Sequence, residues 1–314
     1  MNSWIARLQN NRWWIYQRER FPIFTHGLLI WVFSGSAVCF SRVLRGGGEW
    51  PAGPALATAF VTALGIFLQL RIADEFKDFA EDSRYRAYRP VPRGLVKLRE
   101  LGWLAAATAL VQLGIAGWLS PRLIPLLLLT WTYLALMTRE FFVEHWIRER
   151  PITYLWTHML ILPLTDLYAT ACDWVPVSST PPAGLMWFVA VSFFNGIGLE
   201  IGRKIRAPEN EEEGVRTYSR LWGGRTATWA WWAALSVTAV SAVAAATQIG
   251  SAGMMGGIMA VLLATAAWLG RRFLNRPSQR TARQLDQFSG VWTLITYLSL
   301  GIVPLLMRIL HRTP

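Results

Sequence analysis

Nine apolar stretches constrain this chain more than any other feature, because each is close to the length that a helix needs to cross a lipid bilayer. A bilayer core is crossed by about 20 helical residues, and only helices or closed barrels satisfy the backbone polar groups inside it. The sequence therefore predicts an all-α integral membrane bundle of about nine transmembrane helices around a central cavity. The stretches lie at about 22–40, 54–73, 98–119, 123–138, 152–171, 184–199, 226–247, 253–270 and 288–306.

Basic residues are concentrated in the connections on one side of this predicted bundle. Of the 31 Lys and Arg residues, 26 lie in the N-terminal segment and in the second, fourth, sixth and eighth connections. Because basic loops favour the cytoplasmic side, we expect the N-terminus to be cytoplasmic, in the inner or plasma membrane if the source is bacterial. Arg, Trp and Tyr mix in segment 1–21, which predicts an interfacial helix on membrane lipid rather than a nucleic-acid partner.

Closely spaced acidic residues follow the second apolar stretch. Asp74, Asp78 and Asp82 are four residues apart, and Glu75 adjoins the first of them. On one continuous helix this spacing advances each side chain by only about 40°, so the three carboxylates would form a row on one face. Such a row repels itself unless a cation lies over it, and Mg²⁺ prefers oxygen ligands of this kind. The alternative, which spacing leaves open, is a solvated charged loop between two membrane helices.

The same stretch resembles the first aspartate-rich motif of the UbiA superfamily of intramembrane prenyltransferases. The family pattern is NDxxDxxxD, with Arg-Pro and then Gly a few residues later. Here residues 74–82 are DEFKDFAED and residues 89–94 are RPVPRG. An Asp-Glu pair replaces the leading Asn-Asp, which keeps the oxygen ligands and adds charge.

This resemblance implies a single UbiA-like membrane domain over residues 1–314, with cytoplasmic active-site loops at 71–97 and 200–225. It implies an enzyme, a prenyltransferase that depends on Mg²⁺. The substrates would be an isoprenyl diphosphate and an aromatic or other lipophilic acceptor, and membrane lipid would surround the protein.

The resemblance also implies roles for particular residues. Asp74, Asp78 and Asp82 would coordinate Mg²⁺ and act in catalysis, with Glu75 in support of the metal. Arg89, which belongs to the trailing Arg-Pro pair, would bind the diphosphate.

A second acidic motif, expected after the sixth stretch, departs from the family pattern. Its trailing Gly, Thr and Gly are present in 214–223 as GVRTYSRLWG, but Glu200 is the only acid at the helix end, and Arg203 and Lys204 follow it. Two interpretations remain open. In one, these cations bind the diphosphate in place of a second metal and Lys204 also acts in catalysis, with Glu200 orienting them and Asn195 as the polar residue that opens the motif. In the other, the site no longer ionises a prenyl diphosphate.

Three further residues are weaker candidates. Arg139 closes the fourth stretch, where relatives carry basic residues near the diphosphate, but it fits a positive-inside anchor equally well. Asp166 lies within the fifth stretch, and an ionisable group inside a span suggests a function because burial of its charge is costly. His158, two turns earlier, is expected to bond a neighbouring backbone carbonyl.

Two alternative functions fit the same sequence. A UbiA-type terpene cyclase would quench the carbocation with the substrate's own double bond. A non-enzymatic transporter or lipid-binding protein would use the same fold and its basic cavity for another anionic ligand.

Overall fold

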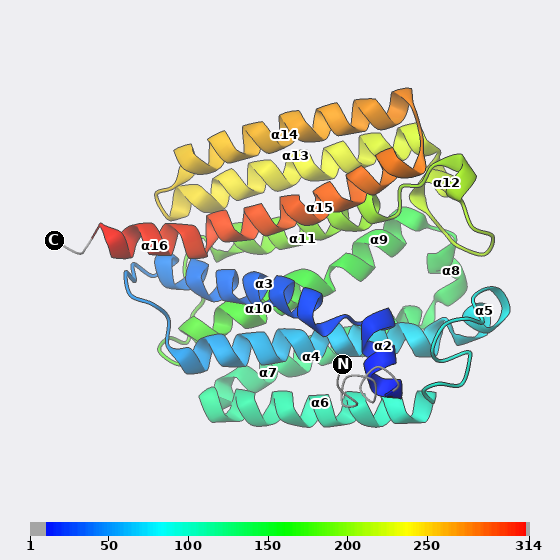
Figure 1. Ribbon diagram of the computed structural model, residues 1–314. Coiled ribbons are helices and arrows are strands. Elements are labelled where there is room, and N and C mark those ends of the chain that lie inside the picture. The colour runs from blue at the N-terminus through cyan, green and yellow to red at the C-terminus, as the bar shows by residue number, and fades with distance from the viewer. Residues whose placement is uncertain (1–10, 312–314) are drawn as a thin grey trace, which may run out of the picture.

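The computed structural model describes residues 11–311, and every regular element in that range is a helix (Figure 1). The prediction of an all-α protein is therefore confirmed. The α-helices are α2 (Arg12–Arg20), α3 (Ile23–Leu44), α4 (Gly53–Lys77), α5 (Phe79–Tyr85), α6 (Leu98–Leu119), α7 (Ile124–Thr138), α8 (Glu144–Arg148), α9 (Pro151–Met159), α10 (Ile161–Trp174), α11 (Leu185–Arg203), α12 (Tyr218–Trp222), α13 (Gly224–Gln248), α14 (Ala252–Asn275), α15 (Gln279–Leu300) and α16 (Ile302–Leu310), joined by the 3₁₀ turns η1 (Pro121–Leu123), η2 (Glu140–Phe142) and η3 (Pro208–Asn210).

Eight helical segments of the described chain are long and apolar enough to cross a membrane, which agrees with a membrane bundle. The count of nine is not confirmed, because the predicted span 152–171 consists of two short helices that meet at Leu160. The eight segments are Ile23–Leu44, Gly53–Lys77, Leu98–Leu119, Pro121–Thr138, Leu185–Arg203, Gly224–Gln248, Ala252–Asn275 and Gln279–Leu310.

The last of these segments contains a break that close packing explains. α15 and α16 meet at Gly301, whose backbone angles are φ −110° and ψ −80°. A Cβ atom at this position would lie 2.2 Å from the carbonyl oxygen of Ser36 in α3. Only glycine therefore allows the α15–α16 junction to approach the backbone of α3 this closely.

The spanning helices lie side by side in one bundle. Figure 1 shows α13 and α14 along one flank, α4, α6 and α7 along the other, and α3, α10, α11 and α15 between them. Large side chains from the middle helices are fully buried there, among them Phe40, Tyr168, Phe188 and Trp292, and Trp231 of α13 is fully buried beside them. This packing brings the short helices α5, α8 and α12 together at one end of the bundle, so the two predicted active-site loops lie at the same end (Figure 1).

The N-terminal helix α2 packs against the first of these loops. Residues 1–10 of the predicted interfacial segment lie outside the described residues, but α2 covers most of the remainder. Tyr16 is buried against α4 and α6. Ion pairs join Arg12 to Glu100 at 2.8 Å, and Arg93 of the loop to Glu19 at 3.0 Å. α2 is therefore fixed to the bundle by both apolar contact and charge.

Candidate active site

The acidic row predicted after the second span does not lie on one helix. α4 ends at Lys77, Asp78 has φ −91° and ψ 3°, and a separate helix, α5, begins at Phe79. The chain turns at Asp78, so Asp82 belongs to α5 whereas Asp74 belongs to α4. The expectation of three carboxylates on one continuous helical face is wrong.

Asp82 is buried beneath two arginines of its own loop. Its side chain is 2% exposed, and its carboxylate lies 3.0 Å from Nε of Arg86 and 2.5 Å from a terminal nitrogen of Arg89. A buried carboxylate needs such partners, because the loss of its hydration is otherwise uncompensated. The guanidinium of Arg89, predicted to bind diphosphate, is thus engaged by Asp82 in this structure, and the pair holds the loop 71–97 in shape.

Glu75 also points away from the predicted metal row. Its side chain is 1% exposed and forms an ion pair with Arg20 of α2. Successive residues on an α-helix are separated by 100°, so Glu75 faces α2 while Asp74 faces elsewhere. The structure therefore places Glu75 in the contact with the N-terminal helix and not beside Asp74 as a supporting ligand.

Asp74 and Asp78 remain the accessible carboxylates of the motif. The side chain of Asp74 is 50% exposed and lies 3.4 Å from the guanidinium of Arg71. Burial raises the pKa of Asp78 above its ordinary value, and the negative charges of Asp74 and Asp82 raise it further. A raised pKa means that the carboxylate is destabilised as an anion, so a bound cation would relieve it.

The metal cluster predicted from sequence is not preassembled. Within residues 11–311, no three side chains of His, Cys, Asp or Glu lie close enough together to hold a metal ion. Mg²⁺, however, is commonly bound through one or two carboxylates, with waters and substrate phosphates completing its octahedron. Asp74 and Asp78 fit that smaller requirement.

The second motif is a carboxylate held between two cations. Glu200 lies in the last turn of α11, where its side chain is 11% exposed. Its two oxygens lie 2.5 Å from the guanidinium of Arg203 and 2.6 Å from Nζ of Lys204. Both cations keep a solvent-accessible side, because their side chains are 54% and 35% exposed. Glu200 therefore orients two positive charges that remain available to an anionic ligand.

The two motifs act on each other across the bundle. Arg203 of α11 interacts electrostatically with Asp74 of α4 and with Asp286 of α15. Its positive charge also acts at a distance on Arg71 of α4 and His26 of α3. Four helices thus contribute charged or titratable groups to one region at the basic end, and this region is the candidate active site.

Two other sequence candidates have different surroundings. Asn195 is buried and exchanges hydrogen bonds with the Thr293 hydroxyl of α15, at 3.2 and 3.3 Å, so it joins two helices. Asp166 is fully buried in α10 and accepts a hydrogen bond from the Tyr297 hydroxyl. Arg139 is exposed at the end of α7.

Sequence reasoning missed a buried network beside the first motif. Glu140 pairs with Lys77 and lies 3.2 Å from Nε2 of His158, and Lys77 also donates to the Tyr154 hydroxyl at 2.9 Å. Burial raises the pKa of Glu140, but the contacts with His158 and Lys77 outweigh it, so the pKa lies below its ordinary value. The His158 ring also contacts the Tyr154 carbonyl oxygen at 2.8 Å, which agrees with the backbone bond expected for it. The sequence carried one signal of this network: Lys77 is a basic residue at the end of a spanning helix, where it needs an acidic partner if it is buried.

The backbone at this network has an unusual conformation. Glu140, Phe141 and Phe142 have φ values of 46°, 53° and 60°, which lie in the left-handed region. Bulky residues rarely adopt this conformation, and such strain tends to gather at functional sites. The ion pair with Lys77 holds the first of these residues in place.

Solved structures with the same fold include UbiA homologues and a digeranylgeranylglyceryl phosphate synthase. A UbiA homologue from Aeropyrum pernix K1 superposes with a TM-score of 0.66 at 16% identity, over 89% of this chain and 97% of that chain. A structure of digeranylgeranylglyceryl phosphate synthase gives 0.58 at 12% identity, over 88% and 93% of the two chains. A UbiA homologue from Archaeoglobus fulgidus bound to DMAPP and Mg²⁺ gives 0.56 at 10% identity, over 91% and 98%.

No protein with a curated description matches this chain. A family model does match, and it covers residues 33–294, which include both motifs and all the helices from the middle of α3 into α15. The matched residues include Asp74, Arg203 and Asp286 of the charged region described above, and the family is the one to which the solved UbiA homologues belong. The chain therefore belongs to the UbiA prenyltransferase family.

Proposed function

We propose that the protein transfers a prenyl group from an isoprenyl diphosphate to a lipophilic acceptor, aromatic or otherwise, inside the membrane. The observation that supports this proposal is the electrostatic interaction of Asp74 with Arg203, which is paired with Glu200 beside Lys204 at one end of an apolar bundle. Such a site offers cations to a diphosphate while the surrounding helices offer an apolar environment to its tail. Family membership and the DMAPP-bound homologue support the same substrate class.

The cofactor we propose is Mg²⁺, held by Asp74 and Asp78. These carboxylates retain accessible oxygens, whereas Glu75 and Asp82 are already paired with arginines. When bound, the metal neutralises charge on the diphosphate as it leaves the allylic carbon. Asp82 then contributes by positioning the loop and not as a direct ligand.

Arg203 and Lys204 replace the second acidic cluster in this proposal. Arg203 suits a phosphate through its planar pair of donors, and Lys204 supplies a point charge. Glu200 forms ion pairs with both cations, and its single negative charge leaves the three-residue cluster with a net positive charge. We place this end of the bundle on the cytoplasmic side, because the basic connections gather there.

A product assay tests the proposal against the alternatives. Purified protein is incubated with geranyl, farnesyl or geranylgeranyl diphosphate and aromatic acceptors, with and without Mg²⁺, and the products are identified by mass. A mass-shifted acceptor formed only with Mg²⁺ supports the transferase. A new hydrocarbon without acceptor would instead indicate a cyclase, and unconsumed diphosphate in every mixture would overturn both enzymatic functions.

Replacing Lys204 with Ala is expected to raise KM for the diphosphate by about tenfold, with a smaller change in kcat. A charge-assisted hydrogen bond contributes about 1.5–3 kcal/mol, and Arg203 remains to orient the substrate. Initial rates at varied diphosphate concentration measure the effect. Arg99→Ala, at an exposed residue in the first turn of α6, is the control. Kinetics unchanged from the wild type would place Lys204 outside the site.

A further inference from the structure

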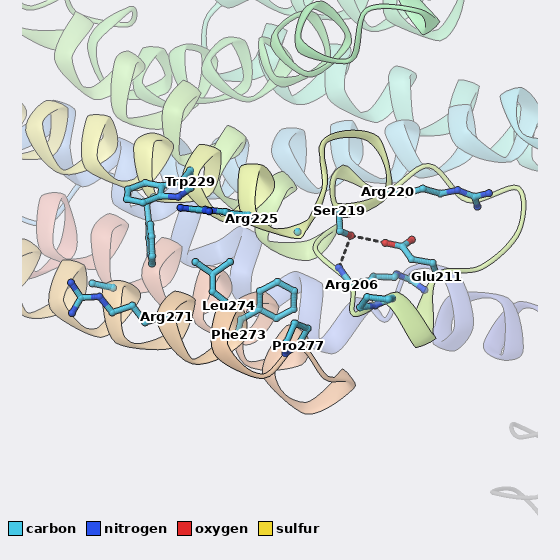
Figure 2. A pocket seen from close by; sticks show the side chains of 14 residues that line it. Arg206, Glu211, Ser219, Arg220, Arg225, Trp229, Arg271, Phe273, Leu274 and Pro277 are labelled. Atoms are coloured by element: carbon cyan, nitrogen blue, oxygen red, sulfur yellow. Dashed lines mark hydrogen bonds between the residues drawn. The ribbon is translucent and has the colours of Figure 1, made fainter.

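A hollow lies on the flank of the bundle formed by α13 and α14. Its volume is about 1060 Å³, and Figure 2 shows residues of these two helices and of the 200–225 loop around it. The first motif contributes none of its lining residues. The hollow therefore differs from the candidate active site, although it shares a loop with it.

The hollow carries an excess of positive charge. Four arginines line it (Arg206, Arg220, Arg225 and Arg271), against Glu211 as the acidic residue. The Glu211 carboxylate is occupied by hydroxyl donors, because Thr217 and Ser219 bind it at 2.6–2.8 Å. It is therefore held by neutral groups and not by the arginines.

Two of these arginines have no polar partner in the described part of the chain. Arg206 binds the Glu212 carboxylate at 2.7 Å, and Arg220 donates to the Glu212 carbonyl oxygen at 3.1 Å. Arg225 and Arg271, by contrast, form no ion pair or side-chain hydrogen bond with any residue between 11 and 311, and both are exposed. Two guanidinium groups are thus free to bind an anion.

Apolar and aromatic side chains lie beside these arginines on the same two helices. Trp229 lies one turn after Arg225 on α13 and is 57% exposed, and Leu274 lies one turn after Arg271 on α14 (Figure 2). Trp232 is fixed by a hydrogen bond from its Nε1 to the Ala266 carbonyl oxygen at 2.9 Å. A Cβ on Gly270 would lie 2.4 Å from the Trp232 ring, so this apolar part is built around a glycine.

The depth of the hollow matches a membrane interface. Arg225 lies in the first turn of one spanning helix and Arg271 in the last turns of the next, so both are at the basic ends of spans. Tryptophan at this depth is typical of the interface, where cations meet lipid headgroups and rings meet acyl chains. A ligand here needs an anionic head and an apolar tail.

We propose that this hollow binds an anionic phospholipid, with its phosphate between Arg225 and Arg271 and an acyl chain along Trp229. Guanidinium groups suit phosphate oxygens, and clustered basic residues next to spans attract anionic lipids. The chemistry recognised is a phosphate ester. A soluble phosphate would leave the exposed Trp229 and the partly buried Leu274 uncovered, whereas a lipid covers them.

The bound lipid would also steady the loop that carries Lys204. The Arg206 amide donates to the Ser219 hydroxyl at 2.8 Å, and the Tyr218 amide donates to the Lys204 carbonyl oxygen at 3.1 Å. These bonds connect the wall of the hollow directly to the second motif. One loop therefore contributes to both the hollow and the second motif, but the lipid binding itself does not depend on any catalytic activity.

Native mass spectrometry of the purified full chain tests this site. The protein is taken from vesicles of phosphatidylcholine mixed with phosphatidylglycerol, and retained lipid is counted for the wild type and for Arg225→Gln/Arg271→Gln. Each arginine near an anionic surface contributes about 1 kcal/mol, so the loss of two is expected to weaken phosphatidylglycerol binding about thirtyfold. Equal retention in the wild type and the double variant would overturn the proposal.

A matched control separates the hollow from overall charge. Arg276→Gln/Arg280→Gln removes the same charge from two exposed residues that do not line the hollow, one in the α14–α15 connection and one in the first turn of α15, and retention is expected to stay at the wild-type level. Equal losses in both double variants would show a diffuse surface effect and overturn the site. Glycerol phosphate is the soluble arm of the experiment, and its displacement of the lipid at equal concentration would overturn the assignment to lipid.

Discussion

Asp78→Asn is expected to lower prenyl transfer by about a thousandfold or more, because a metal at a phosphoryl oxygen supplies several kcal/mol of charge stabilisation. Asparagine keeps the shape of the side chain but lacks the anionic oxygen that would hold Mg²⁺. Asp78 terminates α4 and forms no ion pair in the part of the chain that the structure describes, so the variant should fold and insert normally. Initial rates measured over a range of Mg²⁺ concentrations give the result.

Glu81→Gln is the matched control for this experiment. Glu81 lies three residues further along the chain, and its side chain is 48% exposed and 3.6 Å from Arg148. It removes the same charge from the same loop without touching the proposed metal ligands, so its rate should stay within about twofold of the wild type. Wild-type turnover in Asp78→Asn would remove the metal assignment.

Glu140→Gln is expected to destabilise the protein by about 3 kcal/mol or more, because breaking a buried ion pair leaves an uncompensated charge. The side chains of Glu140 and Lys77 are 3% and 15% exposed, so Lys77 would lose its anionic partner in a poorly solvated position. The left-handed turn that follows would also lose the contact that fixes its first residue. Unfolding in mixed micelles titrated with sodium dodecyl sulfate measures the change.

Two comparisons make that result specific. Glu144→Gln removes an exposed carboxylate, 3.0 Å from Arg148, and should cost less than about 1 kcal/mol. Lys77→Met combined with Glu140→Gln removes both charges and should recover most of the lost stability. A double variant as unstable as Glu140→Gln alone would mean that the pair is not what holds this region together.

The sequence predicted the fold class well, because the membrane imposes a simple rule. An apolar stretch near 20 residues must be helical in lipid, so most spans could be placed within a few residues. The rule fails at 152–171, where it predicted one spanning helix and the structure has two short ones. Hydropathy reports only the composition of a segment and does not detect a break within it. The break at Leu160 depends on packing between helices distant in sequence.

For the acidic motif, too, one part was predictable from the sequence and another was not. Its position at the end of a spanning helix was predicted, and α4 does end there. The row of carboxylates was not, because four-residue spacing produces a row only if the helix continues past Asp78. Asp74 and Asp82 instead fall on different helices, and Asp82 is neutralised by arginines of its own loop.

Contacts between distant residues were out of reach of sequence reasoning. Lys77 ends the spanning helix α4 and Glu140 begins the 3₁₀ turn η2, and neither motif nor spacing relates them. In the second motif the local pattern was more informative, since Glu200, Arg203 and Lys204 are three and four residues apart on one helix end. Their mutual contact followed from helical geometry.

The ion pair between Arg20 and Glu75 has an evolutionary consequence. Glu75 occupies a position where relatives are expected to carry a metal-binding aspartate, but here its charge is cancelled by a residue 55 positions upstream. A mutation that removes one charge leaves the other buried without a partner, so residues 20 and 75 should coevolve. Across an alignment of close orthologues, loss of the arginine at 20 should therefore accompany a neutral residue at 75.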